Sequence, residues 1–160
     1  ENGQLSVMAG GDAVALARVE ATLMAYSKAV KHMGPSGSGQ LTKMVNQIAI
    51  AGVVQGLAEA LHFTRRAGLD PAEVLAAISQ GAAQSWQMDN RWKTAAAGEF
   101  GFGFAVDWMR KDLDIVLTEA RSNGATLPVT ALVDQFYGEV QKLGGNRWDT
   151  SSLLARLEAK

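Results

Sequence analysis

Three polar side chains recur at helical spacing in a segment that is otherwise apolar. Lys43, Asn46 and Gln47 are three and four residues apart, so on a helix they share one arc of about 100°. A lysine in an apolar helix costs free energy unless it is paired, exposed at a cleft or used, because desolvation disfavours its charged form. An ammonium beside two amides can bind a polar substrate and transfer a proton. A lysine that extends from the first turn into solvent accounts for the pattern equally well, and the amides can simply bond nearby backbone.

A glycine-rich turn precedes this helix, where residues 34–39 read GPSGSG. The glycine spacing inverts that of the dinucleotide-binding fingerprint, and no acidic residue follows at the right distance on a second strand. We therefore do not interpret the turn as a Rossmann phosphate loop. Glycine and proline both interrupt regular structure, so we place a domain boundary here.

Three ordered motifs, at residues 3–12, 37–47 and 103–113, resemble those of the β-hydroxyacid dehydrogenases, the family that includes 3-hydroxyisobutyrate dehydrogenase and tartronate semialdehyde reductase. Residues 37–47 (GSGQLTKMVNQ) resemble the family's Gly-x-Gly-x-x-x-Lys signature and the amide that follows it. Residues 3–12 resemble the last part of its nucleotide-binding domain, and residues 103–113 resemble its Gly-Phe and Lys-Asp-Leu segment. The resemblance extends along nearly the whole chain.

The resemblance implies that Lys43 is the general acid or base. A carbonyl that accepts hydride develops alkoxide charge, which a cationic lysine stabilises and can neutralise, and a lysine amine is protonated at neutral pH. Gly39 would belong to the substrate-binding turn. Asn46 and Gln47 would share hydrogen bonding to the substrate, because many relatives carry asparagine four residues after the lysine, where this sequence has Gln47. Tartronate semialdehyde reductases resemble this Asn-Gln arrangement.

The resemblance also implies that Lys111 and Phe104 contact the nicotinamide end of the cofactor. By pattern alone, Lys111 lies off the apolar stripe of its helix and resembles a solvated surface lysine. Asp112 is compatible with an ion pair to Lys111, a local network or plain surface charge. Ser85 and Trp86 are candidates for the lining of a substrate pocket, although neither is favoured by its own pattern.

The elements that must position these residues are mainly helical. A strand, a helix and a second strand are predicted over residues 5–9, 13–27 and 29–33. The longest helix is predicted over residues 40–67; it is apolar on nearly every side, so we expect it to be the buried central element, with close helix packing at Gly52 and Gly56. Further helices are predicted over residues 70–80, 85–97, 106–122, 128–143 and 150–158, the last capped by Asp149 or Thr150.

The resemblance implies a multi-helix domain like the C-terminal domain of 6-phosphogluconate dehydrogenase, preceded by a short β remnant. Residues 1–36 would be the tail of an NAD(P)-binding Rossmann-type domain, most of which lies outside this sequence, and residues 37–160 a helical substrate-binding and dimerisation domain. NAD or NADP would be bound mainly by the absent part, so we expect the chain alone to be nearly inactive. The intact protein would interconvert a small β-hydroxyacid and its semialdehyde or keto acid, as a homodimer.

Three other readings stay open. Imine reductases share the architecture but commonly replace the lysine by another acid, so Lys43 favours a hydroxyacid. The 6-phosphogluconate dehydrogenases have a much longer helical domain. A non-catalytic helical binding or dimerisation module is the alternative from a different class, and the presence of both Lys43 and Lys111 argues against it.

Composition excludes several classes. The 160 residues are 48% hydrophobic with a net charge of -1, as in one globular domain, and offer no basic footprint for nucleic acid or anionic lipid. The lack of cysteine excludes thiolate chemistry and agrees with a cytoplasmic protein. The longest apolar stretch, near residues 48–54, is far shorter than the roughly 20 residues of a membrane helix. His32 and His62 lie on different predicted elements without a carboxylate set, so we expect no metal site.

Overall fold

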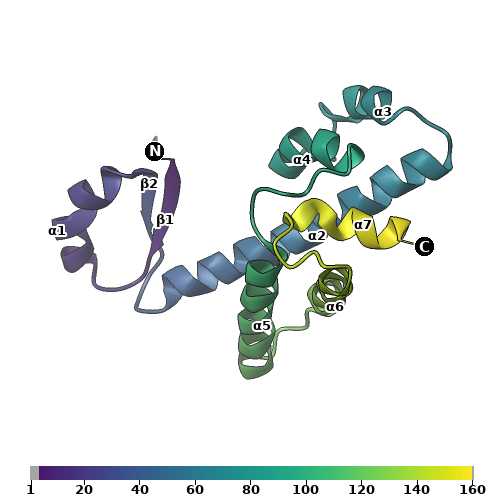
Figure 1. Ribbon diagram of the computed structural model, residues 1–160. Helices are drawn as coiled ribbons and strands as arrows, with labels where there is room; N and C mark the ends of the chain where they lie inside the picture. The colour runs from purple at the N-terminus through teal and green to yellow at the C-terminus, as the bar shows by residue number, and fades with distance from the viewer. Residues whose placement is uncertain (1–3, 160) are drawn as a thin grey trace. The chain divides into compact units, whose positions relative to one another are not determined.

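A computed structural model describes residues 4–159. The chain divides into two compact units, Glu1–Asn46 and Gln47–Lys160 (Figure 1). Gly3, the first residue of the earliest motif, lies outside the described residues. The division falls inside one long helix, and the predicted domain boundary between residues 36 and 37 stays a prediction.

The first unit contains a parallel β–α–β arrangement. Strand β1 (Leu5–Ala9) pairs with β2 (Ser27–His32) in parallel register, and α1 (Ala13–Met24) connects them (Figure 1). Parallel strands need such a crossover, and this unit is the building block of Rossmann-type sheets. Asp12 caps α1, because its carboxylate accepts a 2.8 Å hydrogen bond from the Ala15 amide. The helix ends three residues earlier than predicted because Ser27 already belongs to β2.

Two glycines let the end of β1 approach the start of the helix that follows β2. A Cβ built at Gly39 overlaps the carbonyl oxygen of Met8, and one built at Gly10 lies 2.7 Å from the oxygen of Pro35. Both distances are too short for a side chain. Within the first unit, Gly39 therefore has a packing function whatever else it contacts.

Helix α2 (Ser38–Arg66) is close to the predicted span of 40–67. Ala51, Val54, Ala58 and Leu61 on it are buried in the core of the second unit. In contrast, Leu41, Val45, Val53 and Phe63 are between 39% and 69% exposed. The prediction of burial on nearly every side is therefore wrong for the described chain.

The predicted close packing at the two mid-helix glycines is also not found. A Cβ built at Gly52 or Gly56 meets no heavy atom within 4 Å among the residues that the structure describes. Apolar composition shows that a helix face can be covered, but it does not specify which element covers it.

The second unit is helical. Its further elements are α3 (Pro71–Ile78), α4 (Trp86–Ala96), α5 (Val106–Asn123), α6 (Pro128–Lys142), the 3₁₀ turn η1 (Thr150–Ser152) and α7 (Leu153–Glu158) (Figure 1). Local signals explain most ends: Asp70, Ser85 and Asp149 accept bonds from backbone amides of the first turn, and Gly124 ends α5 at φ +80°. The mainly helical fold class with a short β segment is confirmed.

The core of this unit lies where α2, α4, α5, α6 and α7 meet. The apolar stripe predicted for α5 is buried at Val106, Met109, Leu113, Val116 and Ala120. Tyr137, Leu153 and Trp92 fill the space against it. This packing fixes the start of α5, the helix that carries Lys111, and Phe104 lies just before that helix.

Helix α2 also meets the length and composition test for a membrane span, with 33% of its most apolar window buried in the described chain. Core helices of soluble proteins meet the same test, so it does not distinguish the two classes. The expectation of no membrane partner stays a prediction.

Candidate functional site

Lys43 and Asn46 lie on α2 within the first unit. They are three residues apart on a continuous helix, so they occupy neighbouring positions of one face, and both side chains are exposed. An ammonium beside a carboxamide offers several hydrogen-bond donors to one oxygen. The arrangement is therefore suited to bind a carbonyl or hydroxyl oxygen and exchange a proton with it.

Gln47 begins the second unit and differs from its neighbour Asn46. Its side chain is only 3% exposed, and Nε2 donates a 2.7 Å hydrogen bond to Oδ2 of Asp112. The other oxygen of Asp112 pairs with Nζ of Lys111 at 2.8 Å. Of the possibilities left open for Asp112, the structure contains both the ion pair and the local network.

The first half of α5 and the residues next to it present an aromatic and cationic surface. The Phe104 ring, 37% exposed, lies 5.8 Å from the Trp108 ring, and the Arg147 guanidinium stacks on Trp108 at 4.6 Å. Lys111 follows one turn later with its side chain 65% exposed. Flat rings and an ammonium fit the chemistry of a nicotinamide dinucleotide, which combines planar rings with an anionic pyrophosphate.

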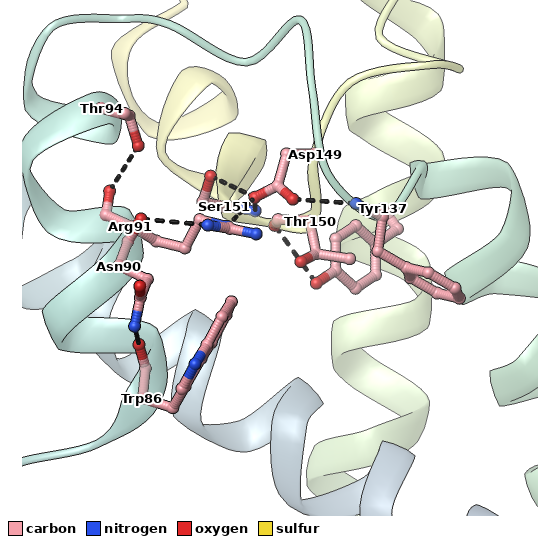
Figure 2. A network of polar contacts seen from close by, with 9 residues as sticks. Trp86, Asn90, Arg91, Thr94, Tyr137, Asp149, Thr150 and Ser151 are labelled. Atoms are coloured by element: carbon pink, nitrogen blue, oxygen red, sulfur yellow. Dashed lines mark hydrogen bonds and ion pairs between the residues drawn. The ribbon is translucent and has the colours of Figure 1, made fainter. Parts of the chain in front are cut away.

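A buried carboxylate holds the segment that leads into α5. Asp149 is 1% exposed, and its carboxylate accepts a 3.0 Å hydrogen bond from the backbone amide of Phe104. It also accepts both the amide and the hydroxyl of Ser151, and pairs with Arg91 Nε at 3.1 Å. Figure 2 shows these groups converging from α4, from the segment before α5 and from η1.

Sequence reasoning recognised Asp149 only as a helix cap. That function is confirmed, but the contacts with Arg91 and Phe104 were missed. The only local signal was an aspartate before a short helix, which does not distinguish a solvated cap from a buried one. Ser85 is likewise a helix cap, because its hydroxyl accepts a 3.1 Å hydrogen bond from the Met88 amide. The Arg91 guanidinium lies over the Trp86 ring.

Burial shapes the chemistry of Tyr137, which contacts this network. Its hydroxyl donates to the Thr150 carbonyl oxygen at 3.3 Å. Burial, and next the charge of Asp149, raise the pKa of the Tyr137 hydroxyl well above its usual range. Tyr137 therefore stays neutral and serves the core rather than proton transfer.

The two histidines occupy separate places. His32 Nε2 lies 2.7 Å from the Gly11 carbonyl oxygen, and Nδ1 of His62 is buried. Among residues 4–159, no three His, Asp or Glu side chains gather in a way that could hold a metal ion.

Comparison with known proteins identifies the family. A family model described as the NAD-binding domain of NADP-dependent 3-hydroxyisobutyrate dehydrogenase matches residues 37–157. The chain belongs to this family. The resemblance inferred from the motifs is thereby confirmed, and so is NAD or NADP as the cofactor of the family.

Individual relatives of this 3-hydroxyisobutyrate dehydrogenase family agree. An uncharacterised oxidoreductase of Shewanella frigidimarina is 66% identical over 158 residues, covering 99% of this chain and 54% of the relative. The 2-hydroxy-3-oxopropionate reductase of Escherichia coli is 33% identical over 98% of this chain and 53% of its own length. The chain thus spans about half the length of the curated relatives it matches.

A solved structure supports the fold. The 3-hydroxyisobutyrate dehydrogenase of Mycobacterium tuberculosis, studied with L-serine, superposes with a TM-score of 0.88 at 25% identity, over 98% of this chain and 56% of that chain. The Shewanella frigidimarina and Escherichia coli relatives are oxidoreductases.

Proposed function

We propose that the intact protein containing this chain is an NAD(P)-dependent β-hydroxyacid dehydrogenase. It interconverts a small β-hydroxyacid and its semialdehyde or keto acid, with Lys43 as general acid and base. The observation that carries the proposal is the exposed Lys43–Asn46 pair on α2, within the segment that matches the family. The 2-hydroxy-3-oxopropionate reductase among the relatives points to the same substrate class.

Each predicted site residue has a defined task in this proposal. The bound nicotinamide supplies or accepts the hydride. Lys43 donates a proton to the substrate oxygen during reduction and removes it during oxidation, while its charge stabilises the developing alkoxide. Asn46 or Gln47 hydrogen-bonds the substrate, and Gly39 shapes the turn beside it.

The cofactor is contacted by the segment just before α5 and by the first half of α5. Phe104 offers its ring, and Lys111 its ammonium, to the nicotinamide end of NAD or NADP. Asp112 keeps Lys111 in place through their 2.8 Å ion pair.

The finer features of the architecture belong to the same proposal. Residues 37–160 form a helical substrate-binding and dimerisation domain built round α2, and residues 1–36 complete a Rossmann-type domain. The protein acts as a cytoplasmic homodimer. Because the chain spans about half the length of its relatives, the chain alone lacks much of the cofactor site and is nearly inactive.

The test is turnover of the full-length protein on a panel of β-hydroxyacids and semialdehydes, with NAD and with NADP. Lys43→Ala is expected to lower kcat on the order of 100-fold, as loss of a general acid does. Lys142→Ala is the control, since Lys142 is an exposed lysine in the last turn of α6. An inactive wild type, or a fully active Lys43→Ala variant, overturns the proposal and favours a non-catalytic binding module.

A further inference from the structure

The segment that enters α5 is held by the chain just before α7. The Asp149 amide donates to the Phe100 carbonyl at 2.8 Å, and the Thr150 amide donates to the Phe104 carbonyl at 3.1 Å. Ala105 and Asp149 form an isolated antiparallel bridge. Residues 100–105 therefore take their shape from a partner about 45 positions away.

The Asp149 side chain adds to this backbone pairing. Its carboxylate accepts the Phe104 amide at 3.0 Å and both donors of Ser151, while Arg91 supplies the opposite charge at 3.1 Å. A buried carboxylate is tolerated when its charge is paired and its oxygens are hydrogen-bonded, and both conditions are met here. One buried charge thus ties three parts of the second unit together.

The backbone at Gly103 fits this carboxylate closely. Gly103 has φ +71°, a conformation that favours glycine, and a Cβ built there overlaps Oδ2 of Asp149. The carboxylate occupies the space that a side chain would need. The shape of the segment and the position of Asp149 are therefore mutually dependent.

Arg91 is itself fixed from two sides. Its guanidinium lies 4.8 Å from the centroid of the Trp86 ring and 5.1 Å from that of the Phe102 ring. Phe102 belongs to the held segment, whereas Trp86 begins α4. The arginine therefore links α4 to both the carboxylate and the segment.

We propose that Asp149, oriented by Arg91, is a positioning residue that presents Phe104 to the nicotinamide cofactor. It binds the Phe104 amide and so fixes the residue whose ring rests against Trp108. A segment fixed before binding loses less conformational freedom when the cofactor arrives. The cofactor part of this inference rests on the proposed function, whereas the holding of the segment does not.

The test compares Asp149→Asn with Asp134→Asn in the full-length protein. Asp134 is the control because it also pairs with an arginine, Arg110 at 3.0 Å, but this pair joins α6 to α5 instead of holding residues 100–105. Hydrogen exchange, followed by mass spectrometry on peptides covering residues 100–106, reports local opening. The KM for NAD(P) and kcat are measured in parallel.

For Asp149→Asn we expect exchange in residues 100–106 to rise about 10-fold or more over neighbouring peptides. The KM for the cofactor should rise about 10-fold, with kcat at saturating cofactor changed less than about 3-fold, because positioning is lost but proton transfer is retained. Asp134→Asn should change neither. If Asp149→Asn does not fold, Ser151→Ala, which removes one hydroxyl donor, should give a smaller rise in the same peptides.

Each contrary result has a distinct meaning. Unchanged exchange in residues 100–106, or a rise spread evenly over the second unit as in a merely destabilised protein, overturns the inference. A local rise with an unchanged cofactor KM overturns the positioning of Phe104. A wild type that binds neither NADH nor NADPH overturns the proposed function, and the exchange data still decide whether Asp149 holds the segment.

Discussion

The side-chain amide of Gln47 donates a 2.7 Å hydrogen bond to the carboxylate of Asp112, 65 residues later in the chain. The second oxygen of Asp112 pairs with Lys111. The amide position of the motif at residues 37–47 and the Lys-Asp pair of the motif at residues 103–113 therefore form one hydrogen-bonded chain in the second unit. This connection makes the identity of residue 47 important for α5 as well as for α2.

Shortening Gln47 should break that connection. Gln47→Asn removes one methylene, so the amide no longer reaches Asp112. We expect a loss of about 1–3 kcal/mol in the free energy of unfolding, typical of a buried bond to a charged acceptor, and a severalfold change in KM. Urea unfolding and steady-state kinetics of the full-length protein measure both quantities.

Gln55→Asn is the matched control for Gln47→Asn. Gln55 is also buried on α2 and donates to a carboxylate, that of Glu59 at 2.6 Å, within one helix. Its shortening should lower stability without altering KM. Equal kinetic effects of the two variants would show that the bond to Asp112 has no special relation to the site.

Two glycines of α2 should respond oppositely to alanine. Gly39→Ala forces a methyl group onto the Met8 carbonyl oxygen. We therefore expect the free energy of unfolding to fall by about 1–3 kcal/mol, as in overpacked cores. Gly52→Ala adds a methyl group in open space and reduces the conformational freedom of the unfolded chain. We therefore expect the free energy of unfolding to rise by about 0.5–1 kcal/mol. Thermal unfolding of the two variants tests the contrast. A loss at Gly52 would instead indicate that another helix packs there in the assembled protein.

Tyr137 should make stability decline in alkaline solution. Burial raises the pKa of its hydroxyl above the usual value of 10, so the folded state retains a proton that the unfolded state releases. The stabilisation is complete below about pH 10 and falls by about 1.4 kcal/mol per pH unit as the pH rises towards the folded pKa. Urea unfolding at pH 8 and pH 11 measures this decline.

Tyr137→Phe provides the comparison for that pH dependence. At pH 8 the variant should have a free energy of unfolding about 1 kcal/mol lower than wild type, because the hydrogen bond to the Thr150 carbonyl oxygen is missing. At pH 11 it should be no less stable than wild type, because it has no proton to release. Parallel stability profiles for the two proteins would contradict the prediction. Tyr26→Phe, at an exposed tyrosine, should leave the profile of wild type unchanged.

Local signals predicted most elements well. The helices predicted over residues 70–80 and 85–97 are present, with Asp70 and Ser85 as their caps, and the apolar stripe of α5 is buried from Val106 to Ala120. These features depend on residues within a few positions of one another. The burial predicted for α2 failed, because periodicity reports how apolar a face is and not whether a neighbour of the same chain covers it.

The sequence by itself determined the order of strands and helices, and the motif with Lys43 and Asn46, whose spacing of three residues becomes a shared face on any helix. Only the tertiary structure decided that Asp112 binds Gln47, and that Asp149 joins Arg91 to Phe104. The physical reason is that those contacts span tens of residues. They exist only after packing of the helices has removed the carboxylates from water and left them to find partners in the protein.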